Sequence, residues 1–121
     1  MSEHNNPLSS VSLQKGQYLV REGEKSNCMW ILESGKLVIL KNKGSLQRKI
    51  QEIAPGEFVG EMSFVDQRPR SATILALEDS ELLLIRKDAY DKIFSTLPNW
   101  YALLFKTIIK RLRVASARIK V

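Results

Sequence analysis

The apolar positions in the first two-thirds of the chain form short runs that are separated by glycine turns. These runs are rich in β-branched and aromatic residues, as strands are, and they cover residues 17–20, 28–32, 36–41, 49–53, 72–77 and 81–85. Ser34-Gly35-Lys36 lies between two of the runs, which favours a tight hairpin. Many short strands at nearly regular spacing predict a β-sandwich or barrel.

The last third of the chain has a helical pattern. Residues 88–95 carry apolar positions at Ala89, Ile93 and Phe94 and predict a short helix. Pro98 suits the first turn of a second helix, because the missing N–H of proline costs nothing there. No glycine or proline follows before the end of the sequence, so we expect one long helix over residues 98–121.

This long helix has two apolar stripes. The first follows the four-and-three spacing of a heptad repeat and consists of Tyr101, Phe105, Ile108, Leu112, Ala115 and Ile119. The second, Leu97, Trp100 and Leu104, suits packing on the barrel. Both stripes could also form one broad core face, since the first is shorter than the roughly three to four heptads of a strong signal. We favour a homodimer seam along the first stripe, because a small barrel cannot cover both faces.

The net charge of +6 is concentrated at the C-terminal end. All 13 acidic residues precede Pro98, where an equal number of basic residues balances them. Beyond Pro98 every charged residue is basic: Lys106, Lys110, Arg111, Arg113, Arg118 and Lys120. This segment is either a solvated helix face or a contact surface for an anionic partner.

Three further features narrow the function classes. Cys28 is the single cysteine, so the chain fits a reducing compartment and we expect a cytoplasmic protein. No apolar run approaches the roughly 20 residues that a membrane span needs. His4 is the single histidine, which argues against a multi-histidine metal enzyme on a similar barrel and against a Ser/His or Cys/His pair. We therefore expect a binding protein with no catalytic and no metal site.

The segment 58–74 carries the candidate chemistry. Gly60 permits close approach of a ligand to the backbone, and Glu61 follows it directly. Arg70 precedes small residues whose main-chain N–H groups can reach the oxygens of a ligand. An arginine beside free N–H groups forms an anion cradle, and a carboxylate that faces it accepts hydrogen bonds from hydroxyl groups. This combination suits a nucleotide, although a plain Glu61–Arg70 salt bridge would explain the same two charges.

The segment resembles the phosphate-binding cassette of the cyclic nucleotide-binding domain family. That family includes the bacterial catabolite activator protein and the regulatory subunits of cyclic AMP-dependent kinase. The motifs that match the cassette are Val59-Gly60-Glu61 and Pro69-Arg70-Ser71-Ala72-Thr73-Ile74. Earlier stretches are similar to the opening, the hairpin and the lead-in of the family: Lys15-Gly16 with Arg21-Glu22-Gly23-Glu24, Trp30-Ile31-Leu32-Glu33-Ser34-Gly35 and Ile53-Ala54-Pro55-Gly56-Glu57-Phe58. Val59 replaces the common phenylalanine before Gly60.

The resemblance covers about residues 13–97 and implies a fold. It is mainly β, a β-jelly-roll barrel followed by a short helix and a long C-terminal helix. We accordingly assign residues 1–12 to a flexible tail, residues 13–97 to the barrel with its cassette, and residues 98–121 to a dimerisation and lid helix.

The resemblance also implies roles for single residues. Glu61 would accept the ribose 2′-OH, and Arg70 would pair with the cyclic phosphate. The N–H groups of Ser63, Ser71 and Ala72 would hold the exocyclic phosphate oxygens. The expected site, with an apolar wall of Ile39, Ile50 and Val59, is Gly60, Glu61, Met62, Ser63, Arg70, Ser71, Ala72, Val59, Ile39 and Ile50.

We expect cyclic AMP as the ligand and cyclic GMP as the second choice. In the family a threonine after the arginine can bond the guanine amino group, and here that position is Ser71. Arg111 or Arg113 is expected to stack on the base, and movement of the C-terminal helix is expected to relay binding. No DNA-binding domain is visible after that helix. The chain is then a free-standing sensor or a module of a larger transcription factor, channel or signalling enzyme.

Overall fold

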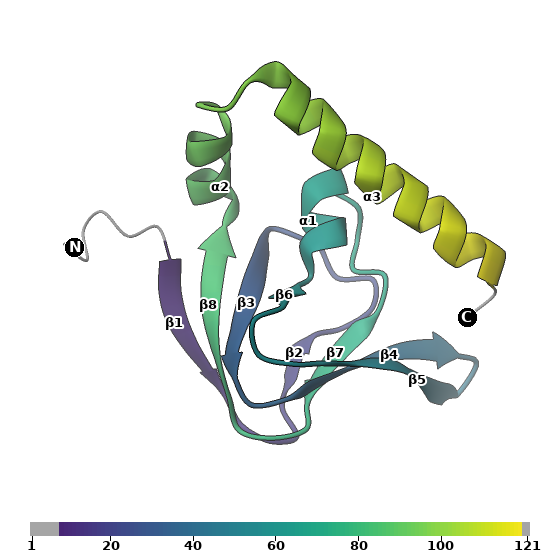
Figure 1. Ribbon diagram of the computed structural model, residues 1–121. Coiled ribbons are helices and arrows are strands. Elements are labelled where there is room, and N and C mark those ends of the chain that lie inside the picture. The colour runs from purple at the N-terminus through teal and green to yellow at the C-terminus, as the bar shows by residue number, and fades with distance from the viewer. Residues whose placement is uncertain (1–7, 120–121) are drawn as a thin grey trace.

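The computed structural model describes the backbone of residues 8–119 and the side chains of residues 8–115. It contains eight strands and three helices within that range (Figure 1). The strands are β1 (Leu8–Leu13), β2 (Tyr18–Val20), β3 (Cys28–Ser34), β4 (Leu37–Lys43), β5 (Leu46–Ile53), β6 (Phe58–Val59), β7 (Thr73–Ala76) and β8 (Ser80–Arg86). The helices are α1 (Glu61–Asp66), α2 (Lys87–Phe94) and α3 (Asn99–Ile119).

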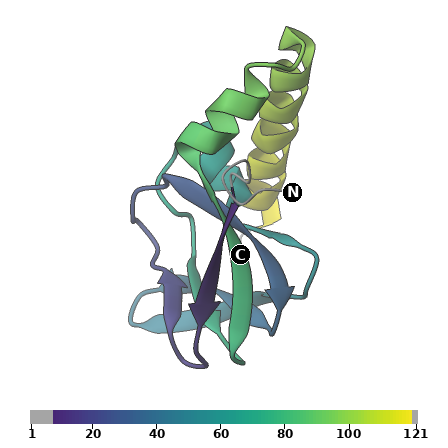
Figure 2. The ribbon, with the colours of Figure 1, turned by 90° about the vertical axis from the view of Figure 1, so that its left-hand side faces the viewer.

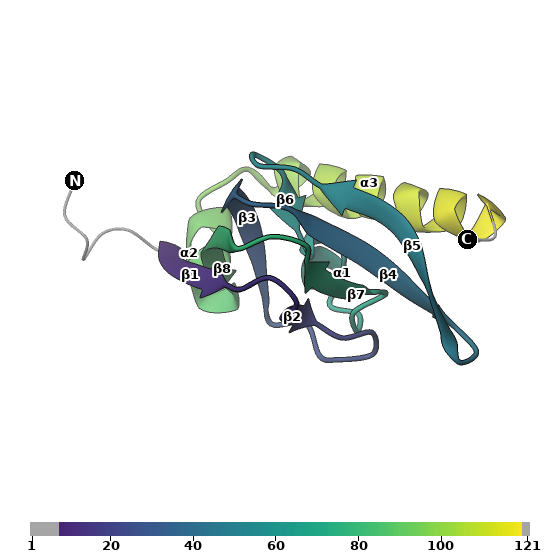
Figure 3. The same cartoon turned by 90° about the horizontal axis from the view of Figure 1, so that it is seen from below.

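The strands form two four-stranded antiparallel sheets that face each other. Their orders are β1-β8-β3-β6 and β2-β7-β4-β5. The hydrophobic core lies between the sheets, and its fully buried members include Leu32, Leu37 and Leu82. The β4–β5 hairpin extends sideways from the barrel (Figure 3). This arrangement confirms the predicted jelly-roll barrel followed by a short helix and a long C-terminal helix.

All six predicted strands are present, but the sequence analysis missed two others. Residues 8–12, which were assigned to a flexible tail, belong to β1 and pair with β8 from Leu8↔Ile85 to Leu13↔Ser80. Three of its six residues are serines, so its composition does not indicate a strand. Its pairing with β8 stabilises it instead. The short β6 was also missed. The rest of the predicted tail, residues 1–7, lies outside the described residues.

The helices gather at one end of the barrel. Figure 2 shows α2 and α3 together above the sheets, and Figure 1 shows α3 crossing over α1. The predicted barrel-facing stripe of α3 is wrong, because Trp100 is 60% exposed whereas Ile109 is 8% exposed. The inward face runs instead through Ala102, Ile109 and Arg113, since α3 docks on α1 rather than on a sheet.

The first stripe of α3 remains outside the core. Tyr101, Phe105, Ile108, Leu112 and Ala115 are all exposed. The side chain of Ile119, which was predicted to extend this stripe, lies outside the described residues. The prediction of a second apolar face that the barrel does not cover therefore holds for residues 101–115.

Candidate ligand-binding site

The site begins at a glycine whose backbone conformation is left-handed. Gly60 precedes α1 and has a φ of 73°. A Cβ atom built on Gly60 would lie 2.6 Å from Nη1 of Arg70 and 3.3 Å from the ring of Trp30. No side chain fits here without displacing the arginine, so this position requires glycine for both conformation and space.

Arg70 is the most deeply buried cation of the site, with 4% of its surface exposed. Its backbone N–H donates to the carbonyl of Glu24 at 2.8 Å, which fixes the loop before β7. Its side chain donates from Nη1 to the carbonyl of Gly60 at 3.0 Å and from Nη2 to the carbonyl of Cys28 at 2.6 Å. The guanidinium also lies 5.1 Å from the ring centroid of Trp30. Main-chain acceptors and a ring therefore orient it.

The charge of Arg70 has no carboxylate partner among the described residues. The ion pairs there do not include Glu61–Arg70, so the plain salt bridge that the sequence left open is not what the structure contains. Burial lowers the pKa of the guanidinium from its ordinary value, which is the direction expected for a desolvated cation. In the part of the chain that the structure describes, Nε of Arg70 is buried with no hydrogen-bond acceptor. A buried guanidinium with an unused donor favours an anionic ligand.

Glu61 is the acidic counterpart in the same cavity. It is the first residue of α1, and burial raises the pKa of its carboxyl, with repulsion from Glu57 adding to the effect. A hydrogen bond from its own backbone N–H opposes this shift. The carboxylate thus carries a desolvation cost that hydroxyl donors of a ligand would offset.

Eight of the ten predicted site residues line one cavity of about 100 Å³ between α1 and the sheet of β4 and β7. Val20 and Ile74, which the sequence analysis did not assign to the site, complete its lining. The predicted residues in the lining are Ile39, Gly60, Glu61, Met62, Ser63, Arg70, Ser71 and Ala72. Their individual roles stay predictions.

The other two predicted residues do not line this cavity. Val59 is fully buried in the core, because its register opposite Trp30 turns its side chain between the sheets. Ile50 occupies a bulge in β5, where Ile39 pairs with Gln51 and Leu40 pairs with Lys49, so that Ile50 has no direct partner. Neither position can be recognised without knowing the strand register.

A further cation lies beside the cavity. Nζ of Lys41 in β4 donates to the carbonyl of Ser71 and lies 3.4 Å from a carboxylate oxygen of Glu22. Sequence analysis did not find Lys41, because it is far from the cassette in the chain and carries no motif. It fixes the main chain at Ser71, whose N–H is one of the expected phosphate donors.

Arg113 connects α3 to the helix of the site. Its Nε donates to Oδ2 of Asp66 at 2.8 Å, and its Nη2 donates to Oδ1 of Asp66 at 3.2 Å and to Oγ of Ser63 at 3.3 Å. We expected Arg111 or Arg113 to stack on a bound base. Arg113 holds α1 and Arg111 is exposed, and the stacking of either side chain on a base stays a prediction.

Neither a membrane-crossing helix nor a metal-ligating cluster is present among the described residues. Residues 8–119 contain no helix that combines the length and the apolar character needed to cross a membrane. The same part of the chain has no group of three or more histidine, cysteine, aspartate or glutamate residues placed to hold a metal ion. The single histidine, His4, lies outside it.

Fold and cavity together define a jelly-roll domain with a cassette that is centred on a buried arginine. The family model described as "Cyclic nucleotide-binding domain" matches residues 10–96. The chain belongs to this family.

Its relatives are longer proteins. The chain is 38% identical over 105 residues to a cGMP-dependent protein kinase of Eimeria tenella, covering 86% of this chain and 10% of the relative. It is 31% identical over 102 residues to the cyclic AMP receptor protein of Thermus thermophilus, covering 84% of this chain and 47% of the relative. The chain thus spans less than half the length of these two curated relatives.

Solved structures show the same fold. The EAL enzyme Bd1971 in its cAMP-bound form has a TM-score of 0.79 and 33% identity, with 90% of this chain and 30% of that chain covered. Its cGMP-bound form has a TM-score of 0.80 and 32% identity, with 91% of this chain and 30% of that chain covered. The catabolite activator protein of Thermus thermophilus has a TM-score of 0.77 and 28% identity, with 93% of this chain and 53% of that chain covered.

Proposed function

We propose that this domain binds a cyclic mononucleotide, and that Arg70 and Glu61 bind its phosphate and its ribose. The observation that carries the proposal is that Arg70 lines the same cavity as Glu61 while its buried Nε lacks an acceptor among the described residues. A cyclic phosphate would accept from this guanidinium and from the main chain of Ser71 and Ala72. The ribose 2′-OH would donate to Glu61.

The size of the cavity suits part of such a ligand. Typical small-molecule sites measure roughly 300–1,000 Å³, whereas this cavity measures about 100 Å³. Phosphate and sugar would therefore occupy it, and the base would lie at its mouth near Ile39. An open position for the base leaves room for a covering element.

We propose cyclic AMP as the preferred ligand and cyclic GMP as the weaker one. Ser71 lines the cavity directly after Arg70 and lacks the methyl group of a threonine. The relatives support the class of ligand but not the choice within it, since the Bd1971 structures are a cAMP-bound and a cGMP-bound form. Calorimetric titration of the purified chain with each nucleotide, and competition between them, tests both statements. Absence of heat with either ligand would reject nucleotide binding, and tighter cyclic GMP binding would reject the preference.

We also propose that binding is relayed through α3 and that the exposed stripe of α3 forms a homodimer seam. Arg113 ties α3 to Ser63, which lines the nucleotide cavity, so a ligand that repositions α1 changes the docking of α3. Such a domain would regulate an effector, in a longer protein or as a separate partner. We propose a cytoplasmic location, with which the free thiol of Cys28 is compatible.

A further inference from the structure

A second depression lies between α1 and α3 and shares no lining residue with the nucleotide cavity. Its volume is about 680 Å³. Four of the described residues that line it are basic: Arg68 after α1, and Lys106, Lys110 and Arg113 on α3. Asp66 is the one acidic residue in that lining, and Arg113 already holds it.

Most of this positive charge is not neutralised within the described residues. Lys106 and Lys110 take part in none of the ion pairs found there, and both are exposed. Arg68 has one long contact, 3.9 Å from Nε to Oδ2 of Asp66, and 68% of its side chain is exposed. A groove with unpaired cations along one wall attracts an anionic partner.

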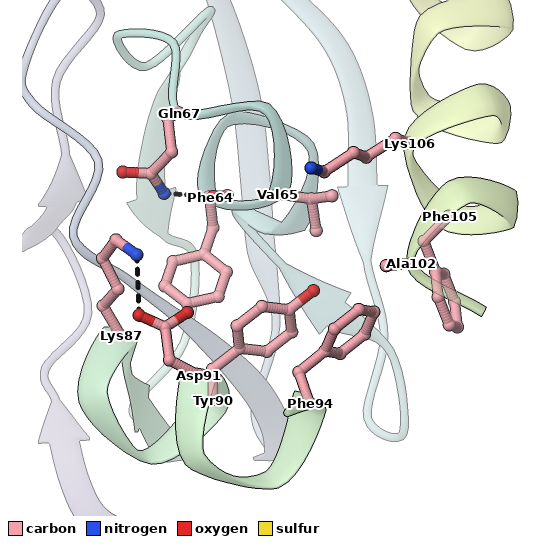
Figure 4. Close-up of a pocket in the computed structure, with 10 residues that line it drawn as sticks. All are labelled: Phe64, Val65, Gln67, Lys87, Tyr90, Asp91, Phe94, Ala102, Phe105 and Lys106. Carbon is pink, nitrogen blue, oxygen red and sulfur yellow. Dashed lines mark hydrogen bonds and ion pairs between the residues drawn. The ribbon is translucent and has the colours of Figure 1, made fainter. Parts of the chain in front are cut away.

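A pocket of about 240 Å³ that is rich in aromatic residues adjoins the basic groove, and its lining also contains the Lys87–Asp91 ion pair. Val65, Gln67 and Lys106 line both, so the two form one continuous depression. Figure 4 shows Tyr90 and Phe94 of α2 facing the α3 side chains across this pocket, with Phe64 of α1 beside them. The depression therefore has an aromatic end near α2 and a basic end along α3.

The spacing of the charges favours a chain of anions over a single one. Lys106 and Lys110, the unpaired cations of α3, are four helical residues apart, which is about 6 Å along the helix axis, and Arg68 lines the groove from the α1 side. A site for one small anion would instead have its cations gathered around a single point. Several carboxylates along a peptide fit charges that are spread over this distance.

The aromatic end favours a side chain over a nucleobase. The rings of Tyr90 and Phe94 stack on each other with centroids 4.8 Å apart, and the ring of Phe64 meets Tyr90 edge-on at 82°. The stack covers one face of Tyr90 and one face of Phe94, and Phe105 packs against Phe94 with ring centroids 5.8 Å apart, so little flat surface remains on which a base could stack. A pocket between packed rings instead suits a bulky apolar side chain as an anchor.

We propose that this depression docks an acidic segment of a partner protein. A large apolar side chain of that segment would enter the aromatic pocket, and its carboxylates would lie along Lys106, Lys110 and Arg68. The proposal does not require nucleotide binding, because the depression and the nucleotide cavity have no lining residue in common and meet only where Arg113 contacts Ser63.

Selection of a random displayed peptide library on the immobilised chain tests this proposal. We expect the selected peptides to be rich in aspartate and glutamate around one large apolar residue. Lys106→Glu/Lys110→Glu should weaken the binding of a selected peptide by roughly tenfold or more. Lys15→Glu/Lys43→Glu, with the same charge change at exposed barrel positions, should leave it unchanged. Ala102→Leu should also weaken it, because the larger side chain enters the aromatic pocket.

Circular dichroism and melting temperature show whether each variant is folded. Selected peptides without acidic enrichment, or equal binding by both double variants, would overturn the proposal. Phosphatidylserine vesicles and a single-stranded oligonucleotide serve as alternative probes. If one of these binds, loses binding on Lys106→Glu/Lys110→Glu, and no acidic peptide does so, the groove recognises that other class and the peptide proposal is wrong.

Discussion

Arg113 of α3 holds Asp66 at the end of α1 through two hydrogen bonds, at 2.8 and 3.2 Å. About four-fifths of each side chain is buried, with 19% and 20% exposed. The same guanidinium reaches Oγ of Ser63 at 3.3 Å. The side chain of Arg113 therefore both docks the C-terminal helix on α1 and contacts the first turn of α1.

Loss of this contact should release α3. Asp66→Asn keeps one accepting oxygen and loses the other, and one hydrogen bond to a charged group contributes about 1.5–3 kcal/mol. Amide exchange over residues 100–113 should therefore rise by roughly 10- to 150-fold. Asp91→Asn on α2 is the control, because its partner Lys87 is exposed and such pairs contribute about 0.3–0.5 kcal/mol. Exchange that changes equally in both variants would show that Arg113 does not hold the helix.

Relay through α3 predicts a second exchange result. Saturating cyclic AMP should change protection over residues 100–113 as well as over residues 61–72, because Ser63 and Arg113 link the two segments. Asp66→Asn should retain the ligand-dependent change at residues 61–72 and lose most of it at residues 100–113. Unchanged protection of α3 in the parent protein on binding would reject the relay.

Nucleotide affinity should depend on the buried arginine and not on its exposed neighbour. An arginine–phosphate hydrogen bond is worth about 1.5–3 kcal/mol, so Arg70→Ala should weaken binding by roughly 10- to 150-fold. Arg68→Ala removes the same charge two positions away, where the side chain is 68% exposed and outside the cavity. Calorimetry should show near-parent affinity for that variant. Equal losses would point to a general field effect instead of a specific contact.

Gly60 offers a way to displace Arg70 without deleting it. Gly60→Ala places a Cβ atom 2.6 Å from Nη1 of Arg70, in a residue with a φ of 73°. Gly16→Ala has similar backbone strain, with a φ of 89°, but its Cβ atom would meet nothing within 4 Å. Both should lower stability by about 1–2 kcal/mol from the left-handed conformation, and only Gly60→Ala should also weaken nucleotide binding. Thermal melts of the two variants measure the effect of backbone strain on stability, and calorimetry measures the effect of the Cβ–Arg70 contact on nucleotide binding.

The carboxyl of Glu61 predicts a pH effect on the ligand-free domain. Its pKa is raised in the folded state by burial, so the folded state binds the proton more tightly than the unfolded state. The associated stability is fully present below the ordinary value of 4.5 and is lost as the pH rises through the folded pKa. Glu61→Gln should remove this pH dependence and raise ligand-free stability at neutral pH, while it weakens nucleotide binding. Urea melts at a series of pH values measure this, with exposed Glu33→Gln as the control.

The sequence predicted those parts of the site that lie close together in the chain. Gly60, Glu61 and Arg70 belong to one short segment, so their types and order reveal the chemistry before any fold is known. Ile50 and Val59 required the strand register, which a bulge and a two-residue strand determine. A shift of one position in a strand moves a side chain to the opposite face.

The helix faces were harder to predict for a related reason. Trp100 is a large apolar residue of α3, yet it is exposed, whereas Ala102 and the cationic Arg113 are partly buried. The apolar residues of a helix show which of its faces favour burial. Which face is buried depends on the element of the same chain on which the helix docks. Asp66, distant in sequence, supplies the partner that brings Arg113 inward.

The exposed stripe of α3 should form the dimer seam. Ile108 and Leu112 are 42% and 47% exposed, one helical turn apart, and belong to the heptad series that begins at Tyr101. Ile108→Asp/Leu112→Asp places two charges in that seam, and sedimentation equilibrium should then report a monomer with an unchanged barrel. Leu103→Asp is the matched control, because Leu103 is 67% exposed but lies outside the stripe, so the dimer should persist. A parent protein that sediments as a monomer at high concentration would exclude the seam. Equal dissociation by Leu103→Asp would instead place the interface on another face of α3, since a charge disrupts only the apolar contact in which it is buried.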